Sequence, residues 1–317
     1  MVTGRLVLVG TPIGNLEDMS PRAIAALTTA DVIACEDTRH TGQLLRKLGI
    51  TRDRIPPEPP NSTRARPGSP EADAAVAAAA SVAANDRLPT KVPLLAVHDH
   101  NEDRQIERVI GRLRHGDTVV LVSDAGMPGI SDPGERLVEA VIEAGISIEV
   151  VPGPTAGVAA LVVSGLAAGR FCFEGFLPRK GSARTRRLSE LVGERRTMVL
   201  FEAPHRLERT VADLVGVLGE ERRVSMSREI TKLYEETWRG TLAEAGRWAS
   251  ERDPRGEFVV VIEGAPEPEP ADDDVILRHL RQHLDSGASV KDAVARVGQD
   301  LTLPKRRVYN LALTLDR

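Results

Sequence analysis

Residues Thr118–Gly134, TVVLVSDAGMPGISDPG, join a short apolar run to a loop rich in glycine and proline. The run Thr118–Val122 predicts a buried strand. Three glycines and two prolines in Ser123–Gly134 are typical of a loop. A helix is expected to follow at Asp132–Ala144. A strand, a loop with fixed backbone groups and a helix together form the unit that lines ligand sites in open α/β sheets.

Strand-like and helix-like segments alternate on both sides of this unit. Apolar runs predict further strands at Leu6–Val9, Val32–Cys35 and Ile148–Val151. Ser20 before Pro21 predicts a capped helix that ends near Thr29. Further helices are expected near Thr41–Leu48 and at Thr155–Ser164. Alternation of this kind predicts right-handed crossovers and a mainly parallel sheet.

The alternating pattern begins again after Gly169. Strands are expected at 197–202, 223–228 and 257–263, and helices at 205–218 and 242–250. The strands are more polar here, which predicts a mixed sheet with an exposed face. Pro266–Pro270 (PEPEP) predicts a stiff linker, and three short helical segments follow at 275–285, 290–298 and 304–315. We therefore expect two α/β domains, 1–168 and 169–265, and a small helix-turn-helix-like module at 271–317.

One segment of the first domain has a different composition. Residues 51–93 are rich in Pro, Arg and Ser in their first half, whereas 71–84 is nearly all alanine. Alanine favours helices but buries little surface. We interpret 51–93 as a flexible insertion and assign it no chemistry.

Bulk composition excludes several classes of protein. With 41% hydrophobic and 28% charged residues in 317, the chain is typical of soluble globular proteins. Its apolar runs are too short for a membrane span or a secretory signal, so we expect a cytoplasmic protein. Two cysteines, Cys35 and Cys172, are too few for a disulfide framework or a metal cluster.

Charge is distributed unevenly. A net charge of −4 argues against a protein that coats nucleic acid over its whole surface. Residues 179–196 nevertheless hold seven basic residues against two acidic ones, and include Arg179 and Lys180. This run either binds RNA phosphates or forms a solvated helix face, and charge alone leaves both alternatives open.

Polar groups follow the ends of the predicted strands. Gly10–Gly14 (GTPIG) after the first strand is either an ordinary turn or a close approach to a ligand. Glu36–Arg39 (EDTR) follows the second strand, and helix capping accounts for Asp37 or Thr38 but not easily for Glu36 and Arg39 together. The loop Ser123–Gly134 presents backbone groups and the Asp124 carboxylate, which suits a neutral or cationic ligand such as S-adenosylmethionine.

The segment His98–Glu102 (HDHNE) is dense in acid–base groups. No further cluster of Cys or His completes a metal site, so we expect no metal. One alternative is that Asn101 and Glu102 merely start a helix over Asp103–Leu113. We favour a loop that faces the substrate.

Together these motifs resemble the tetrapyrrole methylase superfamily, and more closely the bacterial 16S ribosomal RNA cytidine 2'-O-methyltransferases. The resemblance covers most of the chain and departs from the family pattern in 51–93. It rests on motifs at residues 10–16, 34–42, 98–102, 123–134, 151–156, 171–178, 227–232 and 256–264.

The resemblance implies an active cleft between the two α/β domains, S-adenosylmethionine as the cofactor, and commonly a homodimer. The first domain would hold the donor through Pro12, Asp124, Ala125, Gly126, Ile130 and Ser131. The second domain would close over it with Phe173, Glu174, Ala203 and Pro204. The residues facing the acceptor nucleotide would be Glu36, Arg39, His98, His100, Asn101 and Glu102.

The implied activity is methylation of a cytidine ribose in the decoding region of 16S ribosomal RNA, within the small ribosomal subunit. His98 or His100 is a plausible base near neutral pH, with Glu36 or Glu102 next, and Arg39 would orient a phosphate. Two alternatives remain open from the residues. A porphyrinoid C-methyltransferase shares the donor loops but has no use for the run 179–196. A non-catalytic regulator would bind DNA through its C-terminal helices.

Overall fold

The computed structural model describes residues 4–50, 92–98, 101–267, 272–301 and 303–315. Most of the predicted insertion 51–93, His100 and part of the predicted linker 266–270 lie outside these residues. Internal contacts divide the chain into two units, residues 1–264 and 265–317, each described by itself below. Among the described residues, no helix combines the length and the apolar character that crossing a bilayer requires.

The first sheet has five parallel strands in the order β3-β2-β4-β1-β5. This arrangement confirms the predicted parallel sheet. The predicted bounds hold for β2 and β4, whereas β3 was not predicted. The strands are β1 (Arg5–Val9), β2 (Val32–Cys35), β3 (Leu94–Ala96), β4 (Thr118–Val122) and β5 (Ser147–Val151).

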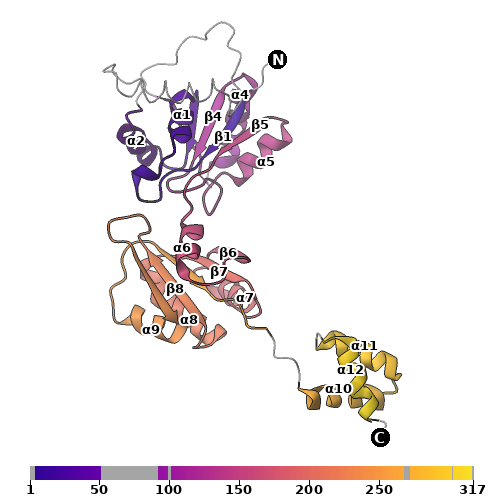
Figure 1. Ribbon diagram of the computed structural model, residues 1–317. Coiled ribbons are helices and arrows are strands. Elements are labelled where there is room, and N and C mark those ends of the chain that lie inside the picture. The colour runs from indigo at the N-terminus through magenta and orange to yellow at the C-terminus, as the bar shows by residue number, and fades with distance from the viewer. Residues whose placement is uncertain (1–3, 51–91, 99–100, 268–271, 302, 316–317) are drawn as a thin grey trace. The chain divides into compact units, whose positions relative to one another are not determined.

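Side chains that alternate along these strands build two separate cores. Val7, Ile33 and Val120 point to one face, where they pack against α1 (Pro21–Thr29) and α2 (Thr38–Lys47). Residues one position away, including Leu6 and Val119, point to the other face. Two more helices cover that face, α4 (Glu102–Arg114) and α5 (Glu135–Glu143) (Figure 1). A strand buried on both faces is apolar throughout, as β4 is.

Two helices begin three residues away from their predicted start. The helix α5 starts at Glu135 rather than Asp132, because the loop continues to Gly134, whose φ is +129°. The helix α2 starts at Thr38 rather than Thr41, because Asp37 caps it by accepting a hydrogen bond from the Arg39 N–H. In both cases the chemistry of the loop, not the apolar periodicity, determines the first turn.

The second sheet is mixed, as predicted, with the strand order β6-β7-β10-β8-β9. Only β6 and β7 pair in parallel, and the other neighbours are antiparallel. Two of the strands, β6 and β9, were not predicted. The bounds are β6 (Phe171–Phe176), β7 (Thr197–Glu202), β8 (Arg223–Arg228), β9 (Glu236–Thr241) and β10 (Phe258–Ile262).

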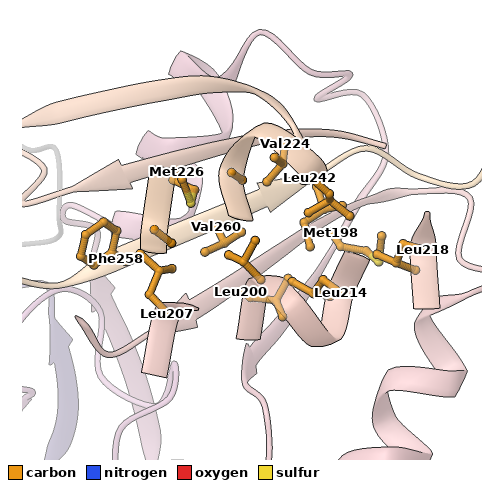
Figure 2. Close-up of a cluster of buried hydrophobic side chains, with 14 of the residues drawn as sticks. Met198, Leu200, Leu207, Leu214, Leu218, Val224, Met226, Leu242, Phe258 and Val260 are labelled. Atoms are coloured by element: carbon orange, nitrogen blue, oxygen red, sulfur yellow. The ribbon is translucent and has the colours of Figure 1, made fainter. Parts of the chain in front are cut away.

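Helices cover both faces of this sheet. Met198, Leu200 and Val260 point to one face and pack against α7 (Gly181–Leu191), α8 (Pro204–Leu218) and α9 (Leu242–Ser250) (Figure 2). Val199 and Val259 point to the other face, under α6 (Ala156–Ser164). The period of two along a strand therefore builds one core on each side.

The expected exposed face of this sheet is wrong at its most polar strand. Ser225 and Ser227 of β8 are fully buried rather than solvated. Their hydroxyls bond to β9: Ser225 Oγ donates to the Trp238 carbonyl, and Ser227 Oγ lies 3.0 Å from Thr237 Oγ1. Burying a polar side chain costs little free energy when it has a hydrogen-bond partner, so these serines are compatible with an interior strand.

Three helices form the C-terminal unit. They are α10 (Asp273–Asp285), α11 (Val290–Asp300) and α12 (Lys305–Leu315), close to the predicted segments. Ile276, Leu280, Val297 and Val308 are buried together at its centre. This unit thus has an apolar core of its own.

Candidate functional site

Three bends meet at the carboxyl end of the first sheet. The backbone of Gly10 faces Gly153 so closely that a Cβ on Gly10 would lie 2.6 Å from the Gly153 Cα. Thr11 and Gly126 exchange backbone hydrogen bonds of 2.8 and 3.2 Å. The loops after β1, β4 and β5 are therefore joined into one rim, as their glycine and proline content predicted.

This rim forms one wall of a cavity of about 480 Å³. Elements of the second sheet form the opposite wall, through the ends of β6, β7 and β10 and the turn after β8. Seven of the ten predicted donor residues line the cavity: Ala125, Gly126, Ile130, Ser131, Phe173, Ala203 and Pro204.

The other three predicted donor residues, Pro12, Asp124 and Glu174, are not part of the cavity wall. The Asp124 carboxylate turns toward the start of α2, where it accepts a hydrogen bond from the Asp37 N–H and lies 3.5 Å from His40 Nδ1. Glu174 lies at a bulge in β6 and pairs with Arg187 of α7. The positions of Asp124 and Glu174 in the sequence did not show in which direction their side chains point.

Several cavity residues were missed. The missed Phe176 and Phe201 form an aromatic group with the predicted Phe173, and the Phe173 and Phe201 ring centres are 5.0 Å apart. Ile230 and Lys232 come from the turn after β8, inside a motif that resembles the family but to which no role was assigned. The remaining missed residues are Ile13, Met127, Asp132, Thr155, Ala156, Gly157, Val158, Phe171, Val199, Glu202, Glu257, Phe258 and Val259.

Asp132 is the half-buried carboxylate of the donor loop. Burial raises its pKa, a hydrogen bond with Ser123 acts against this, and the charge of Asp124 raises the pKa further. Its carboxylate is thus held by the loop itself. Among the missed residues it had the clearest signal in the sequence, because it lies in the glycine-rich loop two residues before Gly134.

Helix capping explains more of Glu36–Arg39 than expected. Besides capping α2, the Asp37 carboxylate pairs with the Arg39 guanidinium at 2.8 Å, so one residue accounts for Arg39 as well. The hydrogen bonds from Arg39 lower the pKa of Asp37 to about 2. Arg39 is 87% exposed and remains accessible to solvent. Glu36 is half-buried between β2 and this cap.

Asn101 organises the segment after β3. Its amide Nδ2 donates to the Ala96 carbonyl and lies 3.0 Å from His98 Nε2, while its Oδ1 accepts from the His98 N–H. Because Nδ2 is a donor, His98 Nε2 is the acceptor, which selects the tautomer with its hydrogen on Nδ1. Glu102 is buried and bonds to α5. His100, the other predicted base, lies outside the described residues.

The basic run 179–196 divides into two groups. Arg184 is buried and ion-paired with Asp213, Arg187 pairs with Glu174 and Glu190, and Arg196 pairs with Glu194. Arg184 therefore belongs to the fold, whereas Arg187 and Arg196 remain partly exposed, so both alternatives for the rest of the run stay open. Arg179, Lys180 and Arg186 are exposed around the start of α7.

A buried polar network supports the second-sheet wall of the cavity. Arg184 donates to Thr210 Oγ1, and Thr210 donates in turn to Glu202 Oε2 at 2.6 Å. Glu202 Oε1 accepts from the Ala203 N–H and pairs with Arg206. The network therefore fixes the end of β7 and the start of α8, where Ala203 and Pro204 line the cavity.

Comparison with solved structures places the fold. The chain superposes on the methyltransferase CobJ with a TM-score of 0.54 at 21% identity, over 83% of this chain and 95% of the other. It superposes on a diphthine synthase with a TM-score of 0.52 at 12% identity, over 82% and 89%. At such identities the likeness extends to the fold alone.

Sequence comparison reaches further. The chain is 42% identical to a ribosomal RNA small subunit methyltransferase I from Synechocystis sp., over 99% of each chain. It is 40% identical to the protein of the same name from Halalkalibacterium halodurans, over 97% of this chain and 94% of the other. Residues 5–246 match the model of the Tetrapyrrole (Corrin/Porphyrin) Methylases. This protein therefore belongs to the tetrapyrrole methylase family.

Proposed function

We propose that the protein transfers a methyl group from S-adenosylmethionine to the 2'-hydroxyl of a cytidine ribose in the decoding region of 16S ribosomal RNA. The observation that supports this most is the cavity whose walls come from both sheets and which is lined by seven of the ten residues expected to hold the donor. The name shared by the full-length relatives supports ribosomal RNA as the substrate.

The residues of the cavity fit this donor. Its volume of about 480 Å³ lies within the range of roughly 300–1,000 Å³ usual for small-ligand sites. Phe173 and Phe201 offer aromatic rings, and the face of such a ring attracts a nearby cation. Ser131 and Asp132 provide acceptors for amino and ribose groups. When bound, the donor supplies a methyl group already activated by a sulfonium.

Proton transfer from the ribose hydroxyl is assigned to the segment after β3. In the tautomer that Asn101 selects, Nε2 is the nitrogen of His98 without a hydrogen, so it would receive the ribose proton once its hydrogen bond from Asn101 has opened. A positioned base typically contributes about 10²–10⁴-fold. Glu36 and His100 are the alternatives for this role. Glu102 would support the segment from behind, since its carboxylate is directed at α5.

RNA binding is assigned to three exposed basic residues, Arg39, Arg179 and Lys180. Arg39 offers a planar guanidinium that can bind a phosphate through two hydrogen bonds. Arg179 and Lys180 follow β6 and are exposed. Together they would attract the RNA backbone without a basic surface elsewhere, consistent with the net charge of −4. We further propose that the protein is a homodimer that acts in the cytoplasm on the small ribosomal subunit.

A single assay tests the proposed activity. The full chain is incubated with radiolabelled S-adenosylmethionine and either bare 16S RNA, assembled small subunits or uroporphyrinogen. We expect label on one cytidine ribose, mapped by alkaline resistance of the 2'-O-methylated linkage. His98→Gln should lower the rate about 10²–10⁴-fold, whereas the control His115→Gln, at the end of α4, should not. Label on uroporphyrinogen alone, or on a base of the RNA, would contradict the proposal.

A further inference from the structure

The turn Glu229–Glu235, between β8 and β9, exposes two large side chains beside the cavity. Leu233 is 88% exposed and Tyr234 is 71% exposed. Ile230 and Lys232 of the same turn line the cavity wall. The exposed pair therefore follows directly, along the chain, on residues that line the cavity.

Contacts within the turn hold its shape. The Lys232 ammonium bonds to Glu229 Oε1 at 2.9 Å and to Glu257 Oε2 at 3.0 Å. Glu229 Oε1 also accepts from the Glu257 N–H, and Glu235 accepts from the Thr231 N–H. Because these bonds already fix the backbone of the turn, a ligand that binds Leu233 and Tyr234 loses little conformational entropy by ordering it.

Two residues of the turn adopt a backbone conformation that their side chains disfavour. Glu229 has a φ of +50° and Thr231 a φ of +66°. A β-branched residue in the left-handed region is an outlier, and residues of this kind persist where the surrounding structure imposes them, often at ligand sites. The turn thus has a specific conformation that its contacts maintain.

The turn is also docked on the first bend of the donor rim. Thr231 Oγ1 accepts a hydrogen bond from the Asn15 N–H at 3.2 Å. A Cβ on Gly14 would lie 2.7 Å from the same oxygen and would also collide with Lys232. Thr231 and Lys232 therefore hold the turn against the loop after β1, which is part of the rim.

We propose that Tyr234, with Leu233 beside it, is the surface on which an unstacked nucleobase of the RNA substrate stacks. This inference rests on the proposed function. A ribose whose 2'-hydroxyl must reach a cavity belongs to a nucleotide taken out of its helix, and proteins commonly receive such bases on aromatic rings. A turn with a fixed backbone, which carries an exposed ring two residues after the cavity-lining Lys232, meets this requirement.

The test uses the full-length chain and a single-stranded oligoribonucleotide that spans the methylated cytidine, with the fluorescent analogue pyrrolo-cytidine at that position or next to it. Stacking on an aromatic ring quenches its fluorescence. Tyr234→Ala should weaken oligonucleotide binding by about 5- to 150-fold, the range typical of losing one stacked base, and abolish the quenching. Tyr234→Phe keeps the ring and should bind within about threefold of the wild type.

Two controls separate stacking from a structural effect. Ile142→Ala removes an exposed apolar side chain of α5 and should change neither binding nor quenching. All variants should bind S-adenosylhomocysteine as the wild type does and keep its sedimentation coefficient. Because the Tyr234 side chain is largely exposed, its removal should not unfold the chain.

Several outcomes would overturn the inference. Unchanged oligonucleotide affinity in Tyr234→Ala, in a wild type that methylates RNA, would remove the stacking role and leave the proposed function intact. A changed sedimentation coefficient would identify a second copy of the chain as the partner of Tyr234. Lost affinity for S-adenosylhomocysteine would show that the residue supports the cavity instead. A wild type that methylates no RNA would overturn both the function and the inference.

Discussion

Glu102 Oε1 accepts a hydrogen bond from the backbone N–H of Leu137, 3.2 Å away, and Glu102 is only 4% exposed. Leu137 lies in the first turn of α5, whose N–H groups have no partner within the helix. Gly134 precedes that helix and has no side chain with which to cap it. A carboxylate from α4 therefore replaces the missing cap.

Substitutions at Glu102 separate this structural role from a catalytic one. Glu102→Ala leaves a buried N–H without an acceptor and should lower the free energy of unfolding by about 1–3 kcal/mol. Glu102→Gln keeps an oxygen for Leu137, so its stability and its methyl transfer should both stay near the wild type. Urea unfolding and turnover measure the two effects. A stable Glu102→Gln variant with turnover reduced a hundredfold would instead identify Glu102 as the base.

Neighbouring arginines on α7 should differ sharply in their effect on stability. Arg184 is buried and bonds to Asp213, Thr210 and the Pro178 carbonyl. Arg184→Met should lower the free energy of unfolding by about 2–3 kcal/mol. This is somewhat less than the loss expected for a fully buried ion pair, because the Asp213 side chain is 35% exposed. Arg186→Met, on the exposed side of the same helix, should change stability by less than about 0.5 kcal/mol.

The same variants test the support of the cavity wall. Loss of Arg184 frees Thr210 and Glu202, so the KM for the methyl donor should rise while Arg186→Met leaves it unchanged. Equal stability of the two variants in urea would show that the polar network contributes nothing measurable.

The exposed basic residues before α7 should determine how RNA binding depends on salt. Each phosphate contact to a single strand contributes a slope of roughly −0.7 to the plot of log affinity against log salt. The double variant Arg179→Ala with Lys180→Ala should therefore flatten the slope by about 1.4. Removing Arg209 and Arg247, exposed on α8 and α9, serves as the control. An unaltered slope in the first variant would place the RNA elsewhere.

Four of the five strands of the first sheet could be predicted because they are apolar runs bounded by glycine, proline and capping residues, as at Val32–Cys35 and Thr118–Val122. The strands β6 and β9 lie at the edges of the second sheet, and their burial is intermittent, so no clean period marks them. The rim of the cavity could be predicted because its loops follow the carboxyl ends of parallel strands. The opposite wall could not be predicted in this way, since Lys232 and Glu257 meet there only through the pairing of β8 with β10.

The burial of Arg184 could have been predicted from its spacing in the sequence, but a count of basic residues does not show it. It shares one face of α7 with Leu188 and Leu191, at spacings of four and seven residues, and all three are buried. A helical period would have separated it from the exposed arginines. The direction of Asp124 and Glu174 has no such signal, since it depends on a helix start and on a bulge in another element.

Both cysteines should react slowly in the native protein. Burial, followed by the hydrogen bond to Glu174 and its charge, raises the pKa of Cys172 to about 12, and burial raises that of Cys35 to about 11. A raised thiol pKa favours the neutral form, so at pH 8 a much smaller fraction of Cys172 should be the reactive thiolate in the native protein than in an unfolded chain.

Iodoacetamide labelling followed by peptide mass spectrometry measures these reactivities. Between pH 7 and 9 the labelling rate of native Cys172 should rise about tenfold per pH unit with no plateau. The chain unfolded in urea is the reference, and its rate should level off near pH 9. A plateau below pH 9 in the native protein would mean that the Cys172 pKa is not raised.

Arg39 should contribute to binding RNA and not to binding the donor. It lies at the start of α2, paired only at the surface with Asp37, and it is not part of the cavity wall. Arg39→Ala should raise the KM for RNA by about 10- to 150-fold, the loss expected for one charge-assisted phosphate contact. Arg39→Lys keeps the charge but not the planar fork, so it should fall between the two. Calorimetry should give the same affinity for S-adenosylhomocysteine in all three proteins. Because Asp37 still caps α2 through the backbone N–H of residue 39, the helix should keep its stability. Weakened binding of S-adenosylhomocysteine in either variant would instead assign Arg39 to the cavity.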